Sequence, residues 1–407
     1  MTRAPRTLGL LGATMAVAAC GSEPPPSTGG TDVEPGPFGR GLAVIETDYS
    51  STNVALFGFD GASLSPSFTS SKDSLLSWDI ATSSMPMTGE DVVLLDRGRH
   101  LVTWVGVKTG EVRTQLHADA DGLAQNPWDY LEIAPDKAYV LRYDPVTGKG
   151  PHGDVVVVDP RAATVTSGVG KRVDLAASLP IADGDRVHPA RGVIVADRAY
   201  ITTVNATKEY VYSDSMVVAL DTATDEVVGS LVLPGLHDCN GIAVSPDGGE
   251  IALVCAGDLD AYGTTSLGAA GVVRISVPDL TEKKRYPASD LGAGVPGFSL
   301  SYATSTLLLA TLVGNVLDGV DDAAVAIDLD SGDSHEIHRA GPVQLGAVLC
   351  PSRLDAPDDR APEACFLTDA DAFSVVRFPI QKGALGMPTE ISANEGRGRP
   401  PRYLGQF

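Results

Sequence analysis

Closely spaced acidic residues are the first side chains in this sequence to suggest chemistry. Carboxylates one to three positions apart recur along it, namely Asp119/Asp121, Asp258/Asp260, Asp369/Asp371 and Asp318/Asp321/Asp322. Carboxylate oxygens at such spacings could bind Ca²⁺, a hard cation that prefers oxygen ligands. The chain also holds 52 Asp and Glu among its 407 residues, so such pairs arise in turns through composition alone. We therefore expect no resident cofactor and keep bound Ca²⁺ as the alternative.

The signatures of common catalytic sites are absent from the sequence. It contains no G-x-S-x-G elbow, no H-E-x-x-H, no phosphate-binding loop and no G-x-G-x-x-G after a strand. His335 and His338 are three residues apart, which places them on opposite faces of a strand and speaks against a shared metal. His237-Asp238-Cys239 suggests an activated thiol, but a disulfide explains Cys239 better.

Four of the five cysteines form two pairs, Cys239/Cys255 and Cys350/Cys365. Turn residues 246–249 lie midway between Cys239 and Cys255, so the two sulfurs are expected to face each other across a hairpin. The second pair brackets a Pro- and Asp-rich loop and is expected to join its base. Zinc sites need closer ligand spacing with partnering histidines, which is missing here. Two disulfides also agree with export to an oxidising compartment.

Residues 1–19 have the pattern of a secretion signal. Arg3 and Arg6 precede an apolar run from Leu8 to Ala19 that is too short to span a hydrocarbon core of about 30 Å. The letters VAAC at 17–20 resemble the bacterial lipobox, which implies cleavage before Cys20 and acylation of its thiol; an ordinary signal peptide is the alternative. No Asp follows Cys20, which favours the outer membrane over the inner membrane. We expect residues 20–37 to tether a folded head, residues 38–407, to the cell envelope.

The charge balance excludes several classes of partner. With 30 Lys and Arg against 52 Asp and Glu, the formal net charge is −22. Nucleic acid requires a basic surface, and so does docking on anionic lipid. The expected contact with the membrane is therefore the N-terminal lipid anchor, and we expect the head to be a monomer that meets an envelope protein or a small ligand.

The head is built from a repeat of four short strands. Val-, Ile-, Leu- and Tyr-rich runs are broken by Gly, Pro, Asp and Asn, most clearly over residues 190–232. The turn between the last two strands recurs seven times, at 57–64, 105–112, 156–165, 218–227, 275–284, 327–337 and 378–386. The first repeat lacks a first strand, whereas residues 401–407 supply a first strand with nothing after it. Joining these two pieces predicts an all-β, seven-bladed β-propeller whose N- and C-terminal strands share one blade.

Residues 190–257 resemble the YVTN-type β-propeller repeat of bacterial surface and secreted proteins. The resemblance rests on AYITTVN at 199–205, LDTATDEVVGSL at 220–231 and GIAVSPDGGEIALVCAG at 241–257. It implies a propeller in an extracytoplasmic setting and no particular ligand, because propellers host binding, scaffolding and catalysis alike.

The first strands of a propeller line its central channel, so their aligned starts form a candidate ligand site. These positions carry Asp79, Asp129, Arg191, Asn240, Phe298, Gln344 and Arg402. Six of the seven are polar and should gather at one end of the channel, where a small ligand or ion could bind; a solvated funnel is the alternative. Trp78, Trp104 and Trp128 are expected to fill wedge-shaped gaps between blades, with a stacking platform as the alternative.

The sequence favours a lipid-anchored, non-enzymatic binding or scaffolding module. The alternative is a metal-dependent, lactonase-like hydrolase of propeller fold, in which Asp79, Asp129 and Asn240 would bind the metal. A purely structural envelope protein is a third possibility.

Overall fold

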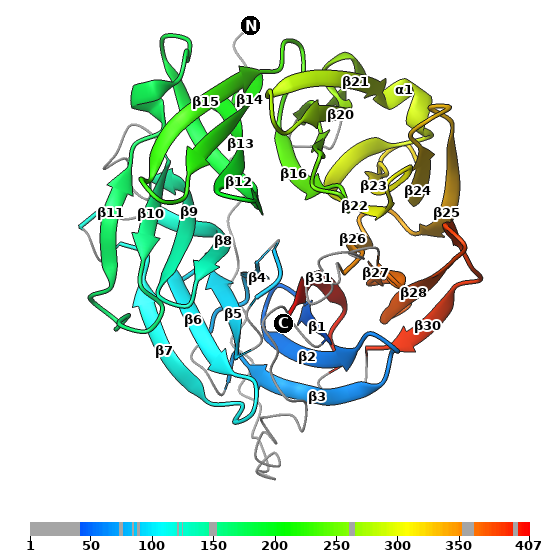
Figure 1. Cartoon of the computed structure of the whole chain (residues 1–407). Helices are drawn as coiled ribbons and strands as arrows, with labels where there is room; N and C mark the ends of the chain where they lie inside the picture. The colour runs from blue at the N-terminus through cyan, green and yellow to red at the C-terminus, as the bar shows by residue number, and fades with distance from the viewer. Residues whose placement is uncertain are drawn as a thin grey trace, which may run out of the picture.

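Seven four-stranded antiparallel sheets surround a common axis in the computed structural model (Figure 1). The structure describes residues 41–407 except 73–75, 84, 88–89, 120–121, 124, 146–152, 260–264, 352–361 and 394–397. The predicted all-β, seven-bladed propeller is confirmed. Residues 1–40, which include the expected signal, Cys20 and the whole tether, lie outside the described residues.

Each blade begins with an inner strand at the axis and ends with an outer strand at the rim. In this order, blade 1 comprises β31 (Pro401–Gln406), β1 (Gly41–Thr47), β2 (Thr52–Gly58) and β3 (Ser63–Ser70). Blade 2 comprises β4 (Ile80–Thr82), β5 (Asp91–Asp96), β6 (Leu101–Gly106) and β7 (Val112–His117). Blade 3 comprises β8 (Gln125–Ala134), β9 (Lys137–Pro145), β10 (Asp154–Val158) and β11 (Val169–Val173). Blade 4 comprises β12 (Asp185–Val195), β13 (Arg198–Thr207), β14 (Tyr212–Asp221) and β15 (Glu226–Val232).

The remaining blades follow the same plan. Blade 5 comprises β16 (Cys239–Val244), β17 (Glu250–Cys255), β20 (Gly271–Ser276) and β21 (Thr281–Pro287). Blade 6 comprises β22 (Val295–Thr304), β23 (Leu307–Val313), β24 (Asp322–Asp328) and β25 (Ser334–Ala340). Blade 7 comprises β26 (Leu345–Leu349), β27 (Ala364–Asp369), β28 (Ser374–Gln381) and β30 (Thr389–Ser392), with β29 (Ala384–Leu385) paired to β28. Outside the blades lie the hairpin of β18 (Asp258–Leu259) and β19 (Thr265–Ser266), the helix α1 (Ala288–Leu291) and 3₁₀ turns at Ala176–Ser178 and Leu267–Ala269.

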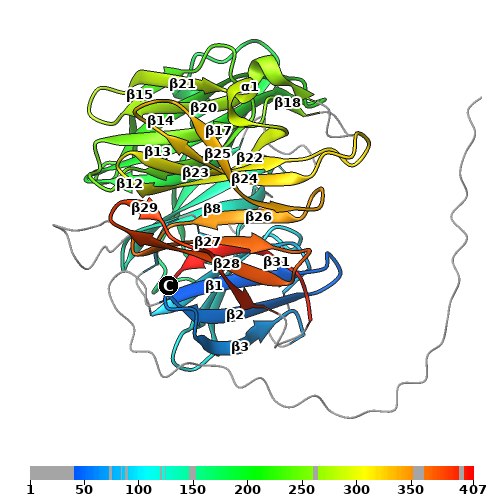
Figure 2. The same ribbon diagram turned by 90° about the vertical axis from the view of Figure 1, so that its right-hand side faces the viewer.

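The blades stack face to face around the ring (Figure 2), and burial is greatest in their middle strands, as β17 and β27 show, and lowest in their outer strands. All six residues of β17 are buried, because neighbouring blades cover both faces of this strand. The outer strand β15 alternates between exposed and half-buried side chains, because only one of its faces meets another blade. None of the helices within the described ranges is long and apolar enough to cross a membrane.

The predicted closure of the ring is confirmed. The last strand, β31, lies antiparallel to β1 with Leu42 opposite Gln406 and Val44 opposite Leu404 (Figure 1). Hydrogen bonds between Gly41 and Phe407 extend this pairing beyond the strands. The first strand of blade 1 thus comes from the far end of the sequence and ties the two ends of the ring together.

Both predicted disulfides are present. Cys239 and Cys255 are direct partners in the register of β16 and β17, and they are bonded. Cys350 and Cys365 join the end of β26 to β27. In the chain-entropy description, closing each loop of 15 or 16 residues stabilises the fold by about 3 kcal/mol.

The three tryptophans occupy three different environments. Trp104 is buried and meets Tyr130 of the next blade edge-on, with ring centroids 5.9 Å apart, which confirms the predicted wedge. Trp78 is 47% exposed, so the wedge prediction is wrong there. Trp128 lies between Tyr143, at 4.5 Å, and the guanidinium of Arg97, at 4.6 Å, so its ring packs against the protein itself.

Candidate functional site

A cavity of about 390 Å³ lies on the propeller axis. The first strands of blades 1, 4, 5, 6 and 7 and the end of β4 supply most of its wall. We call this cavity the channel, and we call the end at which the first strands begin the mouth. Its volume falls within the range of small-molecule binding sites.

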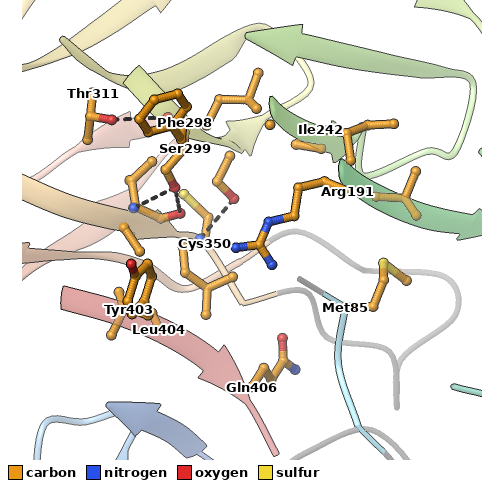
Figure 3. Close-up of a pocket in the computed structure, with 18 of the residues that line it drawn as sticks. Met85, Arg191, Ile242, Phe298, Ser299, Thr311, Cys350, Tyr403, Leu404 and Gln406 are labelled. Atoms are coloured by element: carbon orange, nitrogen blue, oxygen red, sulfur yellow. Dashed lines mark hydrogen bonds between the residues drawn. The ribbon is translucent and has the colours of Figure 1, made fainter. Parts of the chain in front are cut away.

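Two of the six predicted polar site residues, Arg191 and Arg402, line the channel. The guanidinium of Arg191 reaches into it from β12, among Met85, Ile242 and Leu404 (Figure 3). Arg402 donates from Nη1 to the carbonyl of Val343 at 2.8 Å and lies 5.6 Å from the centre of the Tyr49 ring. Its buried Nε has no hydrogen-bond partner among the described residues.

Asp129 is the third predicted residue at this site, and it stands directly behind Arg191. Its carboxylate is fully buried and lies 3.4 Å from Nη1 of Arg191. It also accepts the backbone N–H groups of Gly192, at 3.0 Å, and Tyr130, at 2.9 Å. Burial strengthens this arrangement because no water competes for the carboxylate.

A local irregularity of β12 accompanies the position of Arg191. The register between β12 and β13 shifts between Pro189 and Gly192, and such bulges re-aim side chains next to functional sites. A Cβ on Gly192 would lie 2.7 Å from the end of the Leu131 side chain, so a larger residue here would require Leu131 to shift.

The other three predicted residues bond to their own neighbours at the mouth. Asp79 accepts from Nε of Arg97 at 2.9 Å. Asn240 donates to the carboxylate of Asp238, and its buried Oδ1 has no partner in the part of the chain that the structure describes. The Gln344 amide lies 3.4 Å from the carbonyl of Pro342. The structure therefore brings Arg191 and Arg402 to the channel, places Asp129 behind Arg191, and holds Asp79, Asn240 and Gln344 beside the channel.

These contacts do not form the cation shell that the metal-dependent alternative requires. Asp79 and Asp129 both face arginines, which already neutralise their charge. Within the described ranges, no group of three or more His, Cys, Asp or Glu side chains is placed to hold a metal ion. Of the acidic pairs that suggested Ca²⁺, Asp121 and Asp260 lie outside the described residues. Asp322 uses both carboxylate oxygens to accept backbone N–H groups of Gly314 and residues 343–345.

Sequence reasoning missed a stack of rings at the mouth. Trp128, Tyr143, His188 and Tyr210 follow one another with centroids 4.5, 4.8 and 6.1 Å apart, and Arg97 covers the outer face of Trp128. The stack joins blades 2, 3 and 4 next to Asp129 and Arg191. Its members come from loops and strand ends with no common spacing, so no sequence signal could have found it.

Asp238 is a second feature that the sequence did not reveal, and it makes stability depend on pH. Burial, with a smaller contribution from the charge of Asp258, raises the pKa of Asp238 to about 7. Because the folded state binds this proton more tightly, the free energy of unfolding should fall as pH rises from about 4 towards 7, by at most about 1.4 kcal/mol per pH unit.

Asp238→Asn should remove this dependence of the free energy of unfolding on pH, and asparagine tolerates the positive φ of 51° found here. Urea unfolding at several pH values measures it, with the exposed Asp279→Asn as control; equal slopes in both variants would contradict the assignment.

Comparison with known proteins places the fold among bacterial propellers. No protein-family model matches the sequence, and a search of curated proteins finds no relative. Among solved structures, the chain is similar to a proposed 6-phosphogluconolactonase from Bacteroides fragilis, with TM-score 0.54, 14% identity and coverage of 90% of this chain and 97% of that one. A proposed 6-phosphogluconolactonase from Bacteroides uniformis has TM-score 0.53, 13% identity and coverage of 90% and 99%. The periplasmic gluconolactonase of Pseudomonas aeruginosa has TM-score 0.54, 14% identity and coverage of 89% and 98%.

These neighbours correct the main functional prediction. The expected non-enzymatic binding or scaffolding module is wrong by this comparison, because all three are described as lactonases. They favour the alternative, a lactonase-like hydrolase. At 13–14% identity the likeness itself establishes the shared fold.

Proposed function

We propose that this protein is a lactonase-like hydrolase whose active site is the channel at Arg191. The observation that carries the proposal is the Arg191 guanidinium, held by the buried Asp129 in a cavity with largely apolar walls. In lactone hydrolysis, water adds to the carbonyl carbon and negative charge develops on the carbonyl oxygen. The ring C–O bond then breaks and yields a hydroxy acid.

Arg191 can stabilise the charge that develops in this reaction. A guanidinium is always protonated and presents several N–H donors in a fixed plane. Nη1 of Arg191 makes long hydrogen bonds to Asp129 and to the carbonyls of Thr82 and Trp128, all at 3.4 Å. These contacts fix the group and leave donors for a carbonyl oxygen or a product carboxylate. Fixed donors in a dry site are among the strongest contributions to catalysis.

The metal that the sequence-based alternative included is not part of this proposal. Asp79 and Asp129, which were expected to supply the first ligands, are committed to Arg97 and Arg191. The charge that polarises the carbonyl is therefore assigned to the guanidinium. Lactone hydrolysis requires only attack of water on the carbonyl carbon, so the proposal assigns no protein nucleophile.

The experiment that tests the proposal is a lactonase assay of the purified protein. Release of acid from D-gluconolactone, 6-phosphogluconolactone and unsubstituted or alkyl-substituted γ-lactones is followed in a pH-stat. We expect hydrolysis of at least one class above the rate in buffer. Buffer rates for every lactone, from protein with an intact melting transition, would refute the proposal.

We further propose that the enzyme is a YVTN-type propeller lipoprotein of the cell envelope, anchored through Cys20 and more suited to the outer than the inner membrane. The lipobox-like residues 17–20 and the YVTN-like residues 190–257 support this. The two disulfides agree with an oxidising compartment. In cells supplied with labelled palmitate, the wild type should incorporate label and partition with membranes. Cys20→Ala should do neither; equal membrane partitioning of both proteins would rule out this anchor.

A further inference from the structure

The hydroxyl groups along the channel are already used by the protein. Ser299 donates to the carbonyl of Val348 at 3.1 Å and accepts its N–H at 2.9 Å. Ser301 accepts the N–H of Cys350 at 2.9 Å. The remaining Ser and Thr side chains of the wall bond as follows: Thr82 to the carbonyl of Val93, Ser83 to that of Tyr130, Thr311 to that of Ser299, and Ser245 to the carboxylate of Asp247. A polyhydroxylated ligand would have to compete with these bonds for partners.

Most side chains between these hydroxyls are apolar, with the Gln406 amide as a polar exception (Figure 3). In β12, Val193 and Val195 follow Arg191 at alternate positions, which face one side of a strand. Ile242 and Leu300 continue the wall from β16 and β22, and Met85 completes it near Arg191 (Figure 3). The charged groups among the described lining residues are Arg191, Arg402 and Asp322, and Asp322 is occupied by backbone N–H groups.

The mouth carries exposed apolar side chains beside its polar ones. Tyr49, Phe298 and Val343 line it and are 52%, 51% and 55% exposed. Large apolar side chains left exposed together around a cavity mark a binding surface rather than a neutral one. An apolar group that enters the channel would pass these three residues and then be covered by the walls.

From these observations we propose that the substrate is a lactone with an unbranched hydrocarbon tail, its ring at Arg191 and its tail along the apolar wall. The proposal rests on the lactonase activity proposed for this channel and names its substrate class. It separates this protein from sugar lactonases by physical chemistry: a hydrocarbon tail gains from leaving water, whereas the hydroxyls of a sugar lactone lose hydrogen bonds that this wall does not replace.

A series of γ-lactones with growing tails tests the proposal. The purified protein is assayed with γ-butyrolactone, γ-hexalactone, γ-octalactone, γ-decalactone and D-gluconolactone. Each buried methylene should raise kcat/KM about two- to fourfold until the channel is filled. A kcat/KM that does not change with tail length, or a preference for D-gluconolactone over γ-decalactone, would overturn the proposed substrate class. Neither result would contradict the proposed hydrolase activity.

Binding measured by calorimetry separates the two proposals. If no lactone is hydrolysed, the proposed function fails, and the affinity for the same series then decides the tail site. Affinity that rises with tail length supports an apolar-tail site without hydrolysis, whereas affinity independent of tail length overturns both.

Substitution at Met85 shows whether the tail lies in the channel. Met85→Asp places a charge in the wall and should reduce the advantage of γ-decalactone over γ-butyrolactone at least about tenfold. Met387→Asp is the matched control, because Met387 is 86% exposed and lies outside the channel. Met85→Gln keeps the side-chain length and repeats the test if the aspartate variant does not fold. An unchanged tail dependence in a folded Met85 variant would overturn the proposal.

Discussion

Replacing Arg191 with alanine should lower kcat/KM for lactone hydrolysis by about 10²–10³-fold. Removal of one donor that meets a developing oxyanion costs this much in well-studied enzymes. In this protein the effect is expected to be large, because apolar walls surround the guanidinium and water cannot replace it fully. The loss should lie mainly in kcat, because the charge that Arg191 meets develops in the transition state.

Two further variants make the Arg191 result interpretable. Arg191→Lys keeps the charge but loses the planar fork, so it should recover only part of the activity. Arg113→Ala is the matched control, because Arg113 lies on the outer strand β7, away from the channel, and pairs with Asp91 of β5 at a side-chain exposure of 39%. Asp129 keeps two backbone N–H partners when Arg191 is removed, and thermal melting shows whether the fold survives. Wild-type kinetics in a folded Arg191→Ala protein would remove Arg191 from the mechanism.

The fold was predictable because a propeller is built from repeats of one strand and turn pattern, which the sequence shows several times. Each blade repeats the same strand and turn pattern, and the unpaired first strand at 401–407 could complete only the first blade. Cys239 and Cys255 were predictable for a similar reason, since a hairpin turn fixes the register of the two strands. Local pattern determines all of these features.

The candidate site was predictable only in part, because its contacts join different blades. Alignment of the first strands placed Asp129, Arg191 and Arg402 at one end of the channel, where the structure has them. It could not show that Arg97, from the loop after β5, would bind Asp79. The exposure of Trp78 was missed for the same reason: the packing of a side chain depends on neighbouring blades that a strand pattern does not specify.

The functional prediction was wrong for a different reason. Common hydrolase motifs describe nucleophiles and metal ligands at fixed spacings, whereas a guanidinium held by a carboxylate 62 residues away has no spacing rule. Fold alone could not decide the matter either, since propellers host several functions. The absence of motifs was therefore weak evidence against an enzyme.

Asp322→Asn should destabilise the protein by about 4 kcal/mol, because two of the four backbone N–H groups that this buried carboxylate accepts would lose their acceptor. Asp322 is buried and accepts four backbone N–H groups: those of Gly314 and Val343 on Oδ1, at 2.7 and 2.9 Å, and those of Gln344 and Leu345 on Oδ2, at 2.7 and 2.9 Å. Asparagine keeps one oxygen, but its NH₂ group would face two of these donors. Each buried N–H left without an acceptor costs about 1–3 kcal/mol. Urea unfolding measures the loss.

The adjacent residue offers a matched control. Asp321 has a side-chain exposure of 45% and lies 3.8 Å from Arg339, a surface pair worth little, so Asp321→Asn should change the free energy of unfolding by less than about 0.5 kcal/mol. Equal losses in the two variants would show that Asp322 does not organise the backbone in this way.

Added Ca²⁺ distinguishes two roles for Asp322, that of a cation ligand and that of an acceptor of backbone N–H groups. Both oxygens of Asp322 are occupied, and the segment they hold includes Val343, whose carbonyl binds Arg402 at the mouth. Ca²⁺ or a chelator should therefore leave the gap in stability between the wild type and Asp322→Asn unchanged. A gap that widens with Ca²⁺ would instead make Asp322 a cation ligand. If the gap is constant and Asp322→Asn also weakens γ-decalactone binding, this carboxylate shapes the mouth of the channel through the backbone.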